Sequence, residues 1–223
     1  MVKLVHFKDI DIEKISFEID QDYSTVWVLY ESDRVLFQFP KMSSVFKETV
    51  GQWKDTENYS MCLKHNQEVE DKLTELEKKY LTYVGENYPK IKKNKKAMSY
   101  EKILENELVN VNMVKSWNDL NFIRFKLALE KDDKSKFALD LRFKSKSGDI
   151  SNIKLDTDEK DKLNGCEMKP VARLYGNFTA SITFSMKCVR MIAYETEDSE
   201  MFLEETDEEG SDEESKYSES ESI

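Results

Sequence analysis

The stretch "STVWVLYESDRVLFQFPKM", residues 24–42, contains two β-rich runs separated by a short polar segment. Each run places three large apolar side chains at every second position: Val26, Val28 and Tyr30, then Val35, Phe37 and Phe39. This alternation is typical of strands with one buried face. A turn at Glu31-Ser32-Asp33 joins the runs, and Pro40 ends the second because proline cannot donate a ladder hydrogen bond. The stretch predicts a β-hairpin.

Short β-rich runs recur on both sides of this hairpin. The N-terminal segments "KLVHFK" and "KISFEI" alternate roughly, and "NYSMCLKH" is a candidate strand after a loop that carries Trp53 and Lys54. Further strands are predicted in "NFIRFKLALE" (residues 121–130) and "KFALDLRFKSK" (136–146). The segment "PVARLYGNFTASITFSMKCVRMIAYE" (170–195) predicts a hairpin that turns at Gly176-Asn177, with a bulge near Cys188.

The period changes in "NQEVEDKLTELEKKYLTYV", residues 66–84, where the apolar side chains follow helical spacing (Val69, Leu73, Leu76, Tyr80 and Val84). Asn66 is a suitable N-cap. The pattern favours one helix lying on a sheet over a short coiled coil. Five lysines follow at positions 90–96, as a solvated loop, a phosphate-contacting loop or a nuclear import signal. Residues 100–116 are open between helix and strand. About seven strands with one inserted helix predict a mainly β fold, an OB-like open antiparallel barrel.

The charge is unevenly distributed. The chain carries −11, but residues 195–223 hold fourteen Asp and Glu against one Lys, which is −13, so residues 1–194 carry +2. We therefore expect a domain over 1–198, with a helical and Lys-rich insertion at about 64–116, and a disordered acidic tail over 199–223. The tail is open between a solubility segment, a competitor for a nucleic-acid groove and a hook for a basic partner. Phosphorylation of Ser211 would add negative charge.

Several classes of function are not supported. Three cysteines without paired spacing indicate reduced thiols in an intracellular setting, and the first residues predict neither a signal peptide nor a membrane span. His6 and His65 do not form a metal motif with the cysteines. There is no Gly-rich phosphate loop and no nucleophile elbow. We expect no enzyme, no cofactor and no metal site.

Basic and aromatic residues interleave on the outward faces of the predicted strands. The three patterns are Phe122-x-Arg124-x-Lys126, Arg142-x-Lys144-x-Lys146 and Arg173-x-Tyr175. Cations neutralise phosphates and exposed rings stack on unpaired bases, so this combination is typical of single-stranded nucleic-acid binding. The alternative for each strand is an ordinary solvated face, with Phe122 in the core. Trp27 and Trp53 are open between core and stacking platform. No segment predicts a helix that reads a major groove.

The layout resembles a known family. The segments "VWVLYESDRVLFQFPKM", "NYSMCL", "NQEVEDKLTELEKKY", "FIRFKLAL", "FALDLRF" and "MKPVARLYGNFTASITFSMKCVRM" resemble the single-stranded-DNA-binding proteins of nucleocytoplasmic large DNA viruses. The resemblance spans residues 20–194 and implies an OB-like fold shared with small, acidic-tailed phage proteins of the same function. It implies a place in the host cytoplasm, at the viral factory, or in the nucleus, and not secretion. The sequence departs from the family at the last hairpin, with Tyr175 or Phe178 for the usual Trp, and in ending on Ile223.

Together these observations predict a sequence-independent single-stranded-DNA-binding protein of viral replication, recombination or repair, whose tail competes with DNA and recruits replication proteins. The residues expected to contact phosphates are Arg124, Lys126, Arg142, Lys144, Lys146 and Arg173, with Lys41 in a second tier. Those expected to stack are Tyr175, Trp53 and Phe122. No membrane partner is expected, and a homodimer is left open. The alternative is a virion or scaffold protein that binds basic partners through its tail and has no DNA affinity.

Overall fold

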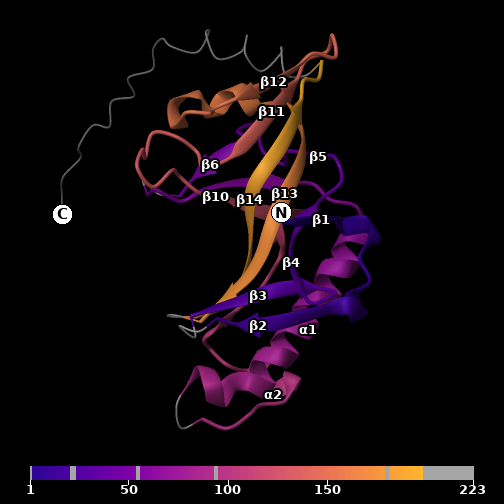
Figure 1. The fold of residues 1–223 in the computed structure, drawn as a ribbon, viewed down its shortest axis with the longest axis vertical. Coiled ribbons are helices and arrows are strands. Elements are labelled where there is room, and N and C mark those ends of the chain that lie inside the picture. Colours follow the sequence, from indigo (N-terminus) through magenta and orange to yellow (C-terminus); the bar gives the residue numbers. More distant parts are fainter. Residues whose placement is uncertain (1, 21–23, 54–55, 93–94, 179–180, 198–223) are drawn as a thin grey trace, which may run out of the picture.

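The computed structural model describes residues 2–20, 24–53, 56–92, 95–178 and 181–197. The strands are β1 (Lys3–His6), β2 (Ile15–Ile19), β3 (Thr25–Tyr30), β4 (Asp33–Gln38), β5 (Met42–Ser43), β6 (Val50–Gln52), β7 (Tyr59–Leu63), β8 (Val109–Asn110), β9 (Val114–Trp117), β10 (Leu120–Leu127), β11 (Asp140–Lys144), β12 (Ile150–Ile153), β13 (Glu167–Asn177) and β14 (Ile182–Tyr194). The helices are α1 (Gln67–Ile91) and α2 (Tyr100–Leu104), with 3₁₀ turns η1 (Phe7–Asp9), η2 (Ile12–Lys14) and η3 (Thr157–Leu163). The predicted mainly β fold with one long inserted helix is confirmed (Figure 1).

The sheet is open. Its main path runs β1-β4-β3-β13-β14-β10-β7-β6, and the two ends of this path do not pair with each other. Most pairs are antiparallel, but β14 pairs in parallel with β8, β10 and β11, and β1 pairs in parallel with β4. Since β14 pairs with the antiparallel strand β13 and with the parallel strands β8, β10 and β11, it joins segments that are far apart in the sequence.

The opening hairpin forms as predicted. Val26, Val28 and Tyr30 are buried on β3, and β4 returns with Val35 and Phe37 buried. The turn between them needs left-handed backbone at Glu31 (φ 52°) and Ser32 (φ 69°), which matches the twist of a two-residue hairpin turn. The buried faces of both strands therefore point to one core, and Trp27 is left on the opposite face.

The hairpin β13–β14 is the longest pair in the sheet, with its register running from Glu167 opposite Tyr194 to Asn177 opposite Thr183. The predicted bulge near Cys188 is confirmed, because the register shifts between Val171 and Ala172. The predicted turn at Gly176-Asn177 is wrong, since both residues lie within β13. Glycine is required at position 176 for a different reason. A Cβ at position 176 would overlap the hydroxyl and ring of Tyr80.

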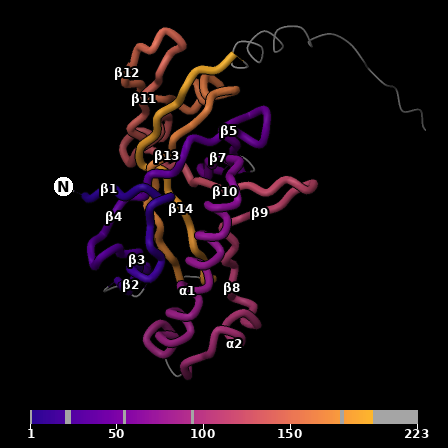
Figure 2. Tube along the Cα trace, turned by 90° about the vertical axis from the view of Figure 1, so that its right-hand side faces the viewer, coloured from indigo at the N-terminus to yellow at the C-terminus, as the bar shows by residue number. Residues whose placement is uncertain are grey.

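Helix α1 has the predicted N-cap and the predicted buried face. The Asn66 side chain accepts a hydrogen bond of 3.0 Å from the backbone N–H of Val69. The five apolar residues of the helical pattern are all buried, and the helix continues beyond Val84 to Ile91. Tyr80 stacks on Phe184 of β14, with ring centroids 4.3 Å apart, so α1 packs on the core face of the sheet (Figure 2).

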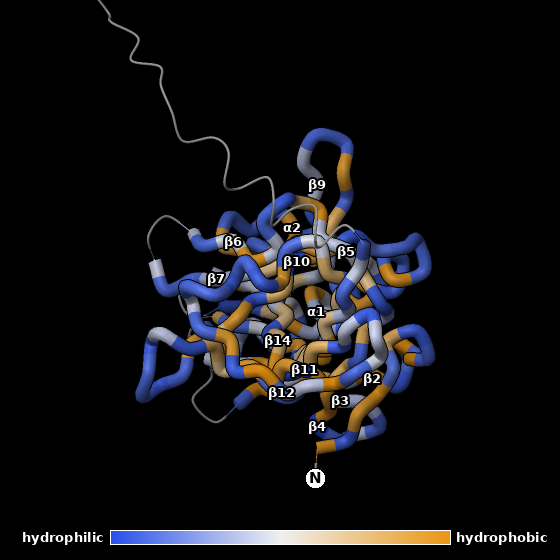
Figure 3. The backbone as a smooth tube through the Cα atoms, turned by 90° about the horizontal axis from the view of Figure 1, so that it is seen from above, coloured by the Kyte–Doolittle hydropathy of each residue, from blue (hydrophilic) through white to orange (hydrophobic). Residues whose placement is uncertain are grey.

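The segment that the sequence left open, residues 100–116, contains α2, β8 and the start of β9. The predicted disordered tail, 199–223, lies outside the described residues, as does Lys54. Within the described ranges, no helix is both long and apolar enough to span a membrane. Seen from above, much of the backbone of hydrophobic residues runs through the interior, and many of the outer loops consist of hydrophilic residues (Figure 3).

Candidate nucleic-acid interface

Strand register collects cations on the face of the sheet opposite the core. Lys126 of β10 lies beside Lys187 of β14 in a parallel pair, and Lys187 lies opposite Arg173 of β13 in an antiparallel pair. Side chains at paired positions share a face, and residues two apart on one strand also do. Arg124 and Tyr175 therefore belong to the same face.

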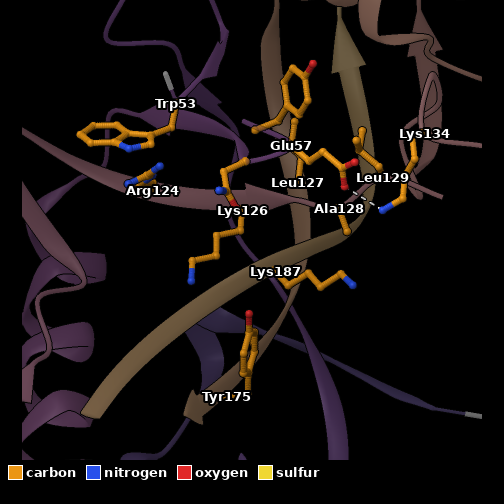
Figure 4. A pocket seen from close by; sticks show the side chains of 12 residues that line it. Trp53, Glu57, Arg124, Lys126, Leu127, Ala128, Leu129, Lys134, Tyr175 and Lys187 are labelled. Carbon is orange, nitrogen blue, oxygen red and sulfur yellow. Dashed lines mark hydrogen bonds and ion pairs between the residues drawn. The ribbon is translucent and has the colours of Figure 1, made fainter. Parts of the chain in front are cut away.

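A groove of about 530 Å³ runs along this face. Its lining combines four cations, three rings, one acid and uncharged residues: Arg124, Lys126, Lys134, Lys187, Trp53, Tyr59, Tyr175, Glu57, Asn58, Leu127, Ala128 and Leu129 (Figure 4). Glu57 forms an ion pair of 2.8 Å with Lys134. Among the described residues, no carboxylate lies within ion-pair distance of Arg124, Lys126 or Lys187. The groove therefore carries net positive charge.

The orientation of Arg124 is fixed by the neighbouring strand. Its Nε donates a hydrogen bond of 3.0 Å to Oγ of Ser60 on β7. The bond uses one of the five N–H groups of the guanidinium, so the others remain for an anion in the groove. Arginine is well suited to this task because its planar group can donate two parallel bonds to one phosphate.

The side chain of Lys126 is exposed overall, but its surroundings disfavour its charged form. Partial desolvation of the ammonium lowers its pKa below the ordinary 10.5, and the positive charges of Arg124 and Lys115 lower it further. Each of these effects disfavours the charged form. A negative charge placed near the ammonium would oppose these effects and favour its charged form.

Figure 4 shows Trp53 at the upper left of the group of side chains and Tyr175 at the bottom, with Lys126 between them. Trp53 follows β6 and is 55% exposed. Its backbone N–H donates a hydrogen bond to the carbonyl of Asn58, and its own carbonyl accepts one from the N–H of Thr56, so these bonds hold the loop together. Tyr175 is half-buried, and burial raises the pKa of its hydroxyl. A planar base has a ring to stack on at either end, with cations between them.

The chain matches no family model and no curated protein. Two solved structures align with most of it. The single-stranded DNA-binding protein from bacteriophage Enc34, in a C-terminally truncated form, is 10% identical with a TM-score of 0.42, over 83% of this chain and 97% of that one. Gp2.5, the single-stranded DNA-binding protein encoded by bacteriophage T7, is 12% identical with a TM-score of 0.39, over 80% and 98%. At these scores the likeness is too weak to assign residues or a function.

Four of the predicted site residues line the groove together: Arg124, Lys126, Trp53 and Tyr175. Arg173 lies next to it, exposed, with its guanidinium 5.6 Å from the ring centroid of Trp27. Arg34 approaches the same ring at 4.8 Å. The face of Trp27 is thus already occupied by guanidinium groups.

Phe122 lies on the groove side of β10 but is only 8% exposed. Its ring packs edge-on against Phe46, with centroids 5.8 Å apart. In this position it supports neighbouring side chains and has no free face for a base.

The remaining predicted cations lie elsewhere. Arg142 and Lys144 are on β11, which pairs with the far half of β14, beyond the bulge, where Arg142 lies beside Ile192. Lys146 follows the end of β11, and its backbone N–H donates to the Glu195 carboxylate. Lys41 forms an ion pair with Glu167 and lies 4.5 Å from the ring centroid of Tyr194. None of these four side chains lines the groove.

The structure adds Lys187, Lys134 and Tyr59 to the lining. The outward direction of Lys187 could be predicted from local alternation, because this residue follows the inward-facing Met186. Its position beside Lys126 depends on a parallel pairing between strands some sixty residues apart, as the register shows. Local sequence patterns do not encode such a pairing.

Proposed function

We propose that the protein binds single-stranded DNA without sequence preference, and that it serves viral DNA replication, recombination or repair, as the family resemblance implies. One observation supports this most: Arg124, Lys126 and Lys187 line the same groove as the rings of Trp53 and Tyr175. Among the described residues, none of these three cations has a carboxylate partner. Cations supply sequence-independent affinity for phosphates, and rings accept any base because every base has a π-face.

A single strand suits this groove better than a duplex. In a duplex the base faces are stacked on one another, so Trp53 and Tyr175 would have no base to contact. An unpaired strand can place its phosphates on the cations and turn its bases toward the rings. With a volume of about 530 Å³, the groove is a local contact site for a few nucleotides of one strand and does not enclose a double helix.

The acidic C-terminal segment has a part in the proposal. Residues 195–223 carry −13, and a tethered anion within tens of ångströms of the groove has an effective concentration of about 1 mM. Binding to the groove at about that strength would weaken DNA binding about twofold. When DNA displaces the tail, the tail is free to recruit basic surfaces of replication proteins.

The test is a titration of fluorescent oligo(dT) by anisotropy at several salt concentrations, beside a duplex of the same length. The single strand should bind more tightly, with log Kd rising with log salt at about 0.7 per phosphate contact. Arg124→Ala should weaken binding about tenfold or more and reduce that slope by about 0.7. Arg142→Ala is the matched control, because Arg142 is an exposed arginine outside the groove and its loss should change little.

Two results would contradict the proposal. One is the lack of oligo(dT) binding by both the full chain and a chain that ends before residue 199. The other is an equal loss in the Arg124 and Arg142 variants, which would indicate diffuse attraction without a groove. Co-purification of a basic protein that depends on the tail, without DNA affinity, would favour the scaffold alternative.

A further inference from the structure

A second cavity of about 340 Å³ adjoins the groove, and Trp53 and Arg124 line both. Its lining also includes Phe46, Glu48, Lys115 and Phe122. Glu48 is the one acid in this lining, and it lies 3.7 Å from the ammonium of Lys160. Lys115 and Arg124 have no carboxylate within ion-pair distance among the described residues. The second cavity thus repeats the combination of rings and unpaired cations.

The hairpin β9–β10 extends from this cavity. Lys115 pairs with Phe122, and Trp117 pairs with Leu120, all on the side of β10 that carries Arg124. The turn between the strands uses left-handed backbone at Asn118 (φ 47°) and Asp119 (φ 63°), so it is tight. In Figure 2 the hairpin projects away from the sheet and from α1. Its tip exposes 54% of Trp117 and 42% of Leu120.

A series of ring contacts connects the hairpin tip to the cavity. The ring of Phe46 lies between the other two, with its centroid 5.4 Å from Trp117 and 5.8 Å from Phe122. Both contacts are angled, at 60° and 71°, so Phe46 supports the indole from one side. A large exposed indole held at a fixed place has an apolar face that water covers poorly.

We propose that this hairpin is a second contact site for the same nucleic-acid strand, an inference that rests on the proposed function. The strand leaves the groove over Arg124 and Trp53, crosses the second cavity with a phosphate beside Lys115, and stacks a base on Trp117. From Arg124 to Leu120 the path along β10 is about 14 Å, at about 3.4 Å per residue. That length accommodates at most about four stacked nucleotides.

A protein partner is the other candidate for an exposed Trp-Leu tip. The nucleic acid is favoured because the patch is small, continuous with the groove through Arg124 and Trp53, and flanked by Lys115, which has no carboxylate within ion-pair distance among the described residues. Charged residues are depleted at the centres of protein interfaces. The same composition on both sides of Trp53 points to one extended ligand.

The test compares oligo(dT) lengths from about 4 to about 20 nucleotides, which spans the site sizes of about 4–16 nucleotides typical of such domains. The wild type should gain affinity until the hairpin is covered. Trp117→Ala should bind the long oligonucleotides about tenfold more weakly and the shortest ones unchanged, whereas Trp117→Phe keeps most of the gain. Lys115→Gln should lower the salt slope by about 0.7 for long oligonucleotides alone. Ile150→Ala, 63% exposed on β12, is the matched control.

The outcomes separate the two proposals. If Trp117→Ala binds every length like the wild type while Arg124→Ala is weakened, the hairpin inference is wrong and the proposed function stands. An equal loss at all lengths also overturns it, as does a loss of self-association in sedimentation with unchanged DNA binding. If neither the wild type nor a chain that ends before residue 199 binds oligo(dT) of any length, the proposed function itself is wrong.

Discussion

At the residue scale, the surroundings of Lys126 disfavour its charged form in the folded protein. Burial lowers the pKa of its ammonium, and Arg124 and Lys115 lower it further. For a lysine, a lowered folded-state pKa means that the charged form is disfavoured in the folded protein relative to the unfolded chain. The free energy of unfolding therefore rises with pH between the lowered pKa and 10.5, because the unfolded chain binds more protons there.

The pH dependence of binding should follow the same group. Bound phosphate favours charged Lys126, so affinity for oligo(dT) should fall as pH rises through the lowered pKa, below the 10.5 of an ordinary lysine. Lys126→Met should remove this step in anisotropy titrations between neutral pH and about 10. It should also leave the free energy of unfolding in urea unchanged or higher at neutral pH. Lys144→Met, outside the groove, should keep the step, and a step that persists in Lys126→Met would assign it to another group.

Gly176 shows how a residue is selected by its neighbour. It lies on β13 opposite Phe184, where the ring of Tyr80 crosses it, and the Tyr80 hydroxyl donates a 3.0 Å hydrogen bond to the carbonyl of Thr183. That ring is buried and cannot swing into solvent. An added methyl group must therefore displace α1 or the strand.

Gly176→Ala should lower the free energy of unfolding by about 1–3 kcal/mol, the usual cost of overpacking. Gly51→Ala is the control, since a Cβ there meets only the Ser60 carbonyl oxygen at 4.0 Å. In a Tyr80→Leu background the cost of Gly176→Ala should shrink, which a double-mutant cycle in urea measures. An unchanged cost in that background would rule out the clash as its cause.

At the element scale, the two halves of β14 pair with different strands. Its first half pairs with β10 and contributes Lys187 to the groove, and its second half pairs with β11. The bulge opposite Val171 and Ala172 separates the halves. For this reason two strands with the same outward pattern of cations, β10 and β11, lie at different places on the sheet, and only one lines the groove.

Helix α1 holds the core face of the sheet, so its cap should affect the whole fold. The Asn66 side chain satisfies the backbone N–H of Val69, one of the donors left free at a helix start. Asn66→Ala should lower the free energy of unfolding by about 1 kcal/mol, within a range of about 0.5–2. Asn66→Asp, which keeps the acceptor and adds favourable charge at the N-terminus, should cost little. Equal losses in the two variants, measured by urea denaturation, would argue against the cap.

At the scale of the whole molecule, charge is separated along the chain. Residues 1–194 carry +2 and residues 195–223 carry −13. Three cations without a carboxylate partner among the described residues, Arg124, Lys126 and Lys187, line one groove. A net charge of −11 on the full chain would repel DNA at a distance. The proposed DNA binding would therefore depend on the local charge of the groove and on where the acidic segment lies.

Removal of residues 199–223 should tighten oligo(dT) binding about twofold or more at low salt, and by less at high salt, since screening weakens the competition. A full-length variant with the acids of this segment changed to Asn and Gln is the matched control, and it should behave like the deletion. Unchanged or weaker binding in both variants would contradict competition by the tail.

Much of the local structure follows from local patterns. The alternation in residues 24–42, the helical spacing after Asn66 and the bulge near Cys188 were all predicted, because each depends on side chains within a few positions of one another. The turn at Gly176-Asn177 was predicted wrongly for the same reason. A Gly-Asn pair is a local turn signal, whereas the ring that requires this glycine belongs to Tyr80, almost a hundred residues earlier in the chain.

The amino-acid sequence by itself determined a mainly β chain with one inserted helix, an outward face of cations and rings, and an acidic end. Only the tertiary structure decided which of those cations share a groove. Register between distant strands places Lys126 beside Lys187 and sends Arg142 elsewhere. The physical reason is that local patterns choose the face of each strand, whereas the packing of the whole sheet chooses its neighbours.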